Sequence, residues 1–234
     1  MTTRKDFLAA GAIVAAMPAA ALADTPAMAP THPKAPKLDF DLEAFDALLD
    51  GAQAHKHLFA SVQIEGGEVF SAMRNTLNAY RDIGVDWSDV LPVAVLYHGF
   101  SILLAFDDFV WNRYIIPLAG KLKHKDGGEQ IASVREHGGS GNPCLREQGG
   151  DWDISIRSLV ADAGARFFVC NNAALGVAHV TANTLGKSFD AVYSDFTHHL
   201  VPNAMLVPAG VWAVHAIQEQ RFTLLQTSLA PPKH

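Results

Sequence analysis

Cys170 is the residue whose type and position point most directly to chemistry. It ends the apolar segment "RFFVC", which predicts a buried strand, and it precedes "NNAALGVAHV", where small and apolar residues recur at helical spacing. A cysteine between a strand end and the first turn of a helix lies close to unpaired backbone N–H groups and to the positive end of the helix dipole. Both favour a thiolate, which acts as a nucleophile or as an acceptor of sulfur.

Other roles for this cysteine stay open at the level of sequence. A cysteine also serves as a small apolar core residue, and the residue pattern does not separate that role from a reactive one. The chain has one further cysteine, Cys144. In an exported protein the two cysteines can form a structural disulfide, or Cys144 can act as the resolving partner of a reactive Cys170.

The elements that must position Cys170 alternate between strands and helices. Apolar periodicity predicts strands over residues 57–64, 91–99, 166–171, 204–210 and 222–226, and helices over residues 38–53, 68–84, 100–115, 153–165, 172–186 and 211–220. This alternation is typical of an α/β fold with three layers, in which an open, mostly parallel sheet has helices on both faces. A polar, glycine-rich insertion at about 121–153 interrupts the pattern within a single domain.

Small and polar residues follow several of the expected strands. In open parallel sheets, ligands bind at the carboxyl ends of the strands, so the residues there are the candidates for a site. We expect Cys170 to carry the chemistry and His98 to assist proton transfer. The residues expected to bind the substrate are Gly99, Asn171, Asn172 and Gly210.

Other residue patterns do not form a recognisable site. The histidines His55, His57, His198 and His199, together with the helical His179 and His215, lack a specific metal-binding spacing, so no metal site is expected. The adjacent Asp107 and Asp108 predict a solvated helix face or an oligomer contact rather than an acid–base pair. No phosphate-binding loop or dinucleotide fingerprint is present, so no cofactor is expected, although flavin is conceivable on such a fold.

The first residues read as a targeting signal. Residues 1–23 combine a basic start, an alanine-rich apolar stretch and an Ala-x-Ala cleavage site, typical of Tat or Sec export, and residues 24–37 form a proline-rich tether. The domain would then be residues 38–234, periplasmic and without stable membrane association after cleavage. The formal net charge of -6 argues against nucleic acid as a partner.

Three segments together resemble the DsrE/DsrF-like proteins: "LPVAVLYHGFSILLA", "GARFFVCNNAALGVAHV" and "VPNAMLVPAGVWAVHAIQEQRFTLLQ". The resemblance covers roughly residues 55–228 and leaves out most of the insertion. It implies a flavodoxin-like α/β domain that assembles into homo-oligomers, as trimers or hexamers. It also implies that Cys170 carries sulfur as a persulfide, with His98 and Gly99 lining the site.

Two functional hypotheses follow. In the first, Cys170 takes sulfur from a small sulfur-containing molecule or from a sulfur-donor protein. In the second, the protein is a non-catalytic periplasmic protein of the same fold, which uses the same crevice to bind a small ligand or acts as a scaffold.

Overall fold

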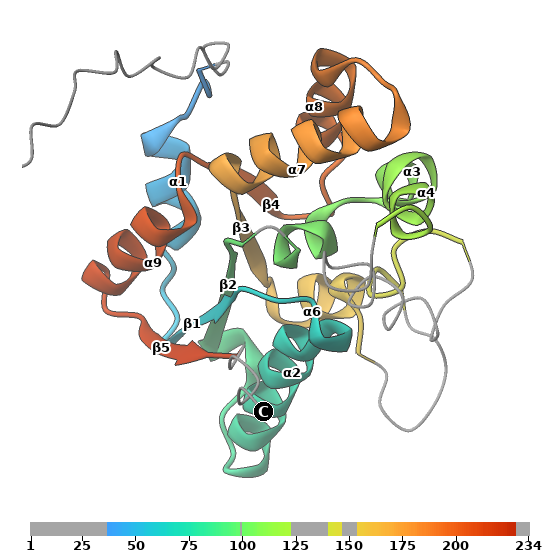
Figure 1. Cartoon of the computed structure of the whole chain (residues 1–234). Coiled ribbons are helices and arrows are strands. Elements are labelled where there is room, and N and C mark those ends of the chain that lie inside the picture. The colour runs from blue at the N-terminus through green and yellow to red at the C-terminus, as the bar shows by residue number, and fades with distance from the viewer. Residues whose placement is uncertain (1–36, 99, 123–139, 147–153, 228–234) are drawn as a thin grey trace, which may run out of the picture. The chain divides into compact units, whose positions relative to one another are not determined.

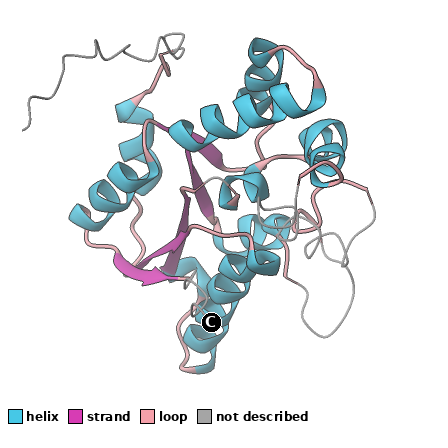
Figure 2. Ribbon diagram, in the orientation of Figure 1, coloured by secondary structure: helices cyan, strands magenta, loops and turns pink. Residues whose placement is uncertain are grey.

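The strands and helices assemble into a sheet covered on both faces, as the alternation predicts (Figures 1 and 2). The computed structural model describes residues 37–98, 100–122, 140–146 and 154–227, which belong to one compact unit, Pro36–His234. The strands are β1 (His55–Ser61), β2 (Val90–Leu96), β3 (Arg166–Cys170), β4 (Ala204–Val207) and β5 (Thr223–Gln226). Their order is β4-β3-β2-β1-β5, and every pairing between them is parallel.

The helices lie on two sides of this sheet. The longer ones are α1 (Leu42–Leu49), α2 (Glu68–Asp82), α6 (Ile156–Ala163), α7 (Asn171–Leu185), α8 (Phe189–His198) and α9 (Gly210–Glu219). The short ones are η1 (Glu65–Gly67), η2 (Trp87–Asp89), η3 (Ser101–Ala105), α3 (Asp108–Val110), η4 (Trp111–Ile115) and α4 (Ile116–Ala119). Figure 1 shows α1 and α9 on one side of the sheet, and α2 and α6 on the other.

The central strand β2 shows why helices must pack on both faces of the sheet. All seven of its residues are buried, which is what its nearly continuous apolar sequence predicts. Ala94 and Leu96 pack with residues of α2, α6 and α7 in one core cluster. Val93 and Val95 pack with residues of α1 and α9 in a second cluster. Burying one such valine or leucine contributes about 1.5–3 kcal/mol, so the sheet is stable only between two helical layers.

One predicted helix is not continuous in the structure. The expected helix over residues 100–115 divides at Phe106, which adopts an extended conformation and forms an antiparallel bridge with Leu200. Asp107 then begins a new helical segment, because its carboxylate accepts hydrogen bonds from the backbone N–H groups of Phe109 and Val110. The residues after this division form α3, η4 and α4 instead of the end of one continuous helix.

The helix α8 is absent from the sequence-based expectations, which place no element between residues 187 and 203. Only Val192 and Phe196 of this helix are buried, so its apolar stripe is one residue wide and gives a weak periodic signal. The other elements are confirmed, with ends that shift by a few residues. The strand expected over 204–210 stops at Val207, because Gly210 already begins α9.

The connections that leave β3 and β4 diverge. The helix after β3, α7, contributes Ala174, Val177 and Ala178 to the core cluster shared with α2. The helix after β4, α9, contributes Ala213 and Ile217 to the opposite cluster, shared with α1. Adjacent parallel strands whose connections leave to opposite faces open a crevice at their carboxyl ends. The fold therefore predicts a ligand site where β3 and β4 end.

Candidate functional site

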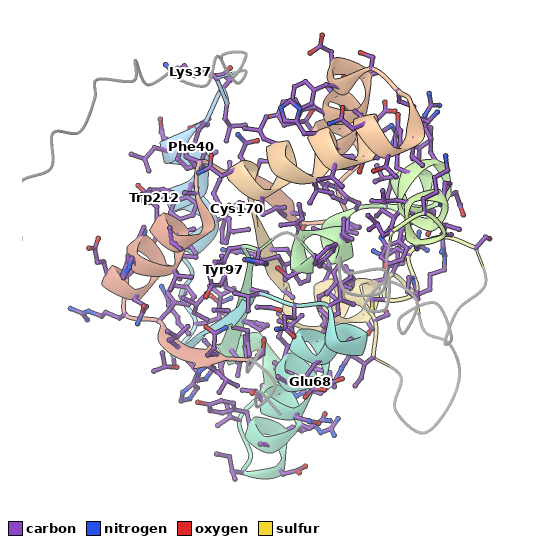
Figure 3. The ribbon with its side chains drawn as sticks, in the orientation of Figure 1. Lys37, Phe40, Glu68, Tyr97, Cys170 and Trp212 are labelled. Atoms are coloured by element: carbon purple, nitrogen blue, oxygen red, sulfur yellow. The ribbon has the colours of Figure 1, made fainter. Side chains whose placement is uncertain are left out.

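A cavity of about 570 Å³ lies at this divergence of α7 and α9. Its described lining comes from the end of β2, the start of α7, the start of α9 and the region of α4. The lining residues are Tyr97, His98, Phe100, Leu118, Leu122, Cys170, Asn172, Ala173, Gly176, Val177, Val180, Ala209, Gly210 and Val211. Figure 3 labels Tyr97 and Cys170 at the ends of the neighbouring strands β2 and β3. The volume lies within the range of about 300–1,000 Å³ that small-molecule sites occupy.

Cys170 occupies the position that the sequence predicts. It is the last residue of β3, it pairs with Val207 of β4, and it is also the N-cap of α7, so the strand runs into the helix without a loop. No side chain caps this helix end. The residue is 6% exposed and faces the cavity. Cys170 therefore lies at the N-terminus of a 15-residue helix, where unpaired backbone N–H groups and the helix dipole favour a negative charge.

A second helix begins at the same cavity. Ala209, the N-cap of α9, makes no side-chain capping hydrogen bond either, and both Ala209 and Gly210 line the cavity. Two helix N-termini thus meet near Cys170, and each carries a partial positive charge. This arrangement favours an anion, such as a thiolate or a persulfide, at the floor of the cavity.

Gly210 permits the close approach of α9 to β2. A Cβ atom at this position would lie 2.9 Å from Cα of Tyr97 and closer still to its Cβ. Tyr97 in turn lines the cavity, and its hydroxyl donates a hydrogen bond to the side chain of Gln226 at 3.3 Å. The glycine therefore sets the distance between the start of α9 and the wall formed by Tyr97.

His98 follows β2 and also lines the cavity, as expected. Its backbone is held by Ser101, which is fully buried. The N–H of His98 donates to Oγ of Ser101 at 3.2 Å, and this hydroxyl donates to the carbonyl oxygen of His98 at 3.3 Å. The turn after β2 thereby presents an exposed imidazole at the same cavity as the thiol.

The residues expected to bind substrate divide into three cases. Asn172 and Gly210 line the cavity. Asn171 does not belong to the lining, since it is buried and its Oδ1 accepts a hydrogen bond from the hydroxyl of Tyr193 at 2.6 Å. That bond ties the first turn of α7 to α8 instead. Gly99 lies outside the described residues.

One face of α7 was overlooked in the sequence. Asn172, Ala173, Gly176, Val177 and Val180 all line the cavity and follow the spacing of one helix face. Starting from Asn172, helical periodicity alone would have found them. Leu118 and Leu122 follow the helix expected over residues 100–115, where no strand or helix is predicted, so no periodic signal indicates them.

Cys144 lies elsewhere and both thiols are free, so neither the disulfide nor a bonded redox pair is present. The sulfur of Cys144 packs against Gly67 at the start of α2, where an added Cβ would lie only 2.7 Å from it. Although the residue as a whole is partly exposed, burial of the thiol raises its pKa to about 12. Cys144 is therefore protonated at neutral pH.

The other candidate groups have structural partners. Asp107 caps α3 and its Oδ2 lies 3.0 Å from Nδ1 of His199, while Asp108 forms an ion pair with Arg146. The two carboxylates thus hold loops rather than form an acid–base pair. Nδ1 of His57 lies 2.6 Å from the hydroxyl oxygen of Thr223.

Two kinds of site are absent from the part of the chain that the structure describes. No group of three or more histidine, cysteine, aspartate or glutamate side chains there could hold a metal ion. Within the same residues, no helix has the length and apolar character needed to cross a membrane.

Comparison with known proteins identifies no family. No family model and no curated protein matches the chain. A solved structure described as a protein of unknown function, MTH1491 from Methanobacterium thermoautotrophicum, is similar over 74% of this chain and 98% of that chain, at 13% identity and a TM-score of 0.35. This TM-score is too low to indicate a shared fold or function.

Proposed function

We propose that this protein handles sulfur and that Cys170 is its sulfur-carrying nucleophile. The observation that carries the proposal is the position of the thiol, which faces a ligand-sized cavity between two uncapped helix N-termini. His98 lines the same cavity and is the group that would accept the thiol proton.

The proposed step is the attack of the Cys170 thiolate on the outer sulfur of a donor persulfide, R–S–SH. A new S–S bond forms to Cys170, the S–S bond of the donor breaks, and the donor leaves as the thiolate R–S⁻ with the bonding electron pair. The product, Cys170–S–SH, ionises to a persulfide anion that the two helix N-termini would stabilise. No external oxidant or reductant is needed.

Intact-mass measurement after incubation with benzyl persulfide, a donor R–S–SH with a neutral apolar group, tests this step. The protein should gain about 32 Da, the mass of one sulfur atom, and reducing agent should remove it. Cys144→Ser is the matched control and should still gain sulfur, because the thiol of Cys144 is buried and protonated. Cys170→Ser should gain none. An adduct that survives Cys170→Ser would overturn the proposal.

A DsrE/DsrF-like protein exported to the periplasm and assembled as a homo-oligomer is part of the same proposal. It is supported by the three resembling segments and by the sequence pattern of residues 1–23, which predicts a targeting signal and lies outside the described residues. The flavodoxin-like layering of the domain is consistent with it. Light scattering on the purified protein would determine whether it is a trimer or hexamer, and N-terminal sequencing of the expressed protein would locate the cleavage.

A second function, non-catalytic binding of a small ligand, is favoured by one observation. Most side chains that line the cavity are apolar, and Cys170 is only 6% exposed. Under this alternative Cys170→Ala would keep full ligand affinity, and the wild-type protein would take up no sulfur under the conditions above.

A further inference from the structure

The cavity beside Cys170 is lined almost entirely by uncharged groups. None of its described lining residues is a lysine, arginine, aspartate or glutamate. Apolar side chains of the α4 region and of α7 line the cavity together with Cys170, among them Leu118, Leu122, Val177 and Val180. Phe100, which follows His98 closely in the chain, also lines the cavity.

A second cavity in the same domain has a different character. It measures about 460 Å³ and its lining includes Lys37, Asp39 and Asp41. Charged lining is therefore available on this fold, and its absence from the described lining around Cys170 is a property of that site. A ligand with several charges would lose its hydration there without gaining an ion pair.

Two helix N-termini supply positive potential in the site. The helix N-termini at Cys170 and Ala209 can stabilise one negative centre next to the sulfur, but their influence falls off within about one helical turn. The cavity, at about 570 Å³, is also far larger than a sulfur atom requires. The remaining volume must be filled by whatever group carries the sulfur.

From this lining we infer that the sulfur donor is a small organic molecule whose sulfur is attached to an uncharged, apolar group. The inference rests on the proposed function and narrows it to a substrate class. The apolar group would contact Leu118, Val177 and Val180, while the sulfur meets Cys170 and the single developing charge lies at the two helix ends. Inorganic thiosulfate and disulfides of charged peptides are disfavoured by the same lining.

Three methanethiosulfonate reagents test the class directly, because they deliver the same sulfur chemistry on different groups. In each, the Cys170 thiolate attacks the sulfenyl sulfur, a mixed disulfide Cys170–S–S–R forms, and methanesulfinate leaves with the electron pair. The group R is benzyl, which is neutral and apolar, or sulfonatoethyl, or trimethylammonioethyl. Each rate is divided by the rate of the same reagent with the urea-unfolded protein, which removes the intrinsic reactivity of the reagent.

The normalised rate should be at least about tenfold higher for the benzyl reagent than for either charged reagent. Val180→Lys, at a lining position that is 48% exposed, should reduce this preference and favour the sulfonate. Ile83→Lys is the matched control, because Ile83 is 76% exposed and lies outside the lining. The Ile83→Lys variant should prefer the benzyl reagent as strongly as the wild-type protein does. Equal normalised rates for the three reagents, or a preference for a charged one, would overturn the inferred class.

A second measurement separates the substrate class from the sulfur chemistry. Cys170→Ala removes the thiol but keeps the walls, and it should bind the neutral dye Nile red, with weaker binding when Val180→Lys is added. Dye binding in this variant supports the apolar class even if the wild-type protein takes up no sulfur, in which case the proposed function alone fails. If the Cys170→Ala variant does not bind the dye, the apolar class is wrong, whatever the outcome of the sulfur-uptake experiment.

Discussion

The two cysteines of this chain share one hydrophobic core cluster, yet they have opposite chemical surroundings. Cys170 faces a cavity where two helices begin, with an imidazole on the same lining. Cys144 lies against the backbone of Gly67, and its thiol has a pKa raised to about 12 by burial. The comparison teaches that the exposed fraction of a residue is a poor guide to thiol chemistry. Cys170 is the less exposed residue of the two, but its sulfur is the one that faces a cavity.

Each cysteine also depends on a glycine that allows a close approach. Gly210 brings the start of α9 against Tyr97 beside Cys170, and Gly67 leaves room for the sulfur of Cys144. The first glycine thus shapes a cavity, and the second one leaves the space that the sulfur of Cys144 fills. We therefore expect a substitution at Gly210 to affect both stability and sulfur uptake, and a substitution at Gly67 to affect stability alone.

The largest effect is expected for Gly210→Ala. The new methyl group would overlap Cα and Cβ of Tyr97, so α9 must move away, and we expect a loss of about 3 kcal/mol in the free energy of unfolding together with the loss of sulfur uptake. Urea denaturation and the intact-mass assay measure the two effects.

Gly176→Ala is the control for this prediction. Gly176 lines the same cavity within α7, but nothing lies within 4 Å of an added Cβ there. Alanine in a helix interior should stabilise the protein by about 1 kcal/mol and leave sulfur uptake intact. A stable, active Gly210→Ala variant would contradict the account of the cavity.

Gly67→Ala should lower the free energy of unfolding by somewhat less, about 2 kcal/mol. It should not affect sulfur uptake at Cys170. Gly67 has a φ of 86°, which alanine adopts at a cost of about 1–2 kcal/mol, and the new Cβ would press on the sulfur of Cys144. In a Cys144→Ala background only the backbone part of this cost should remain. A double-mutant cycle in urea measures the difference, and strict additivity would show that the two residues do not touch.

A fall in stability is also expected at alkaline pH. An unfolded chain releases the proton of Cys144 near its ordinary pKa of 9.0, whereas the folded protein holds it until about pH 12. Between these values the unfolded state binds fewer protons, so stability should fall as the pH rises, by about 1 kcal/mol per pH unit from this group. Cys144→Ala should lack this part of the slope in urea titrations under reducing conditions. If the unfolding free energy of the two proteins depends on pH in the same way, the Cys144 thiol is exposed to water and the account of its burial is wrong.

Much of the fold could be predicted because the sequence pattern within each segment indicates whether it forms a strand or a helix. The apolar run of β2 predicts a strand buried on both faces, and the change from "RFFVC" to a helical pattern places Cys170 at a strand end. These patterns report local periodicity, which the backbone geometry of each element imposes. The three-layer parallel architecture follows from their alternation.

The remaining details depend on contacts between distant segments. The strand order, which sets the divergence of α7 and α9, is not encoded in any one segment. Asn171 and Asn172 are adjacent, but they differ by about 100° around α7, and only Asn172 faces the cavity. Leu118 lines the same cavity as Cys170 although the two residues lie far apart in the chain, so no local pattern indicates that they come together.

Alkylation of the native protein by iodoacetamide tests the central claim most directly, because one neutral reagent compares both thiols in the same molecule. Peptide mass mapping over time at neutral pH gives the two rates. The account predicts that Cys170 reacts at least about 100-fold faster than Cys144, since the reactive form is the thiolate and Cys144 holds its proton until about pH 12. Equal rates, or faster modification of Cys144, would contradict the assignment of Cys170 as the reactive centre.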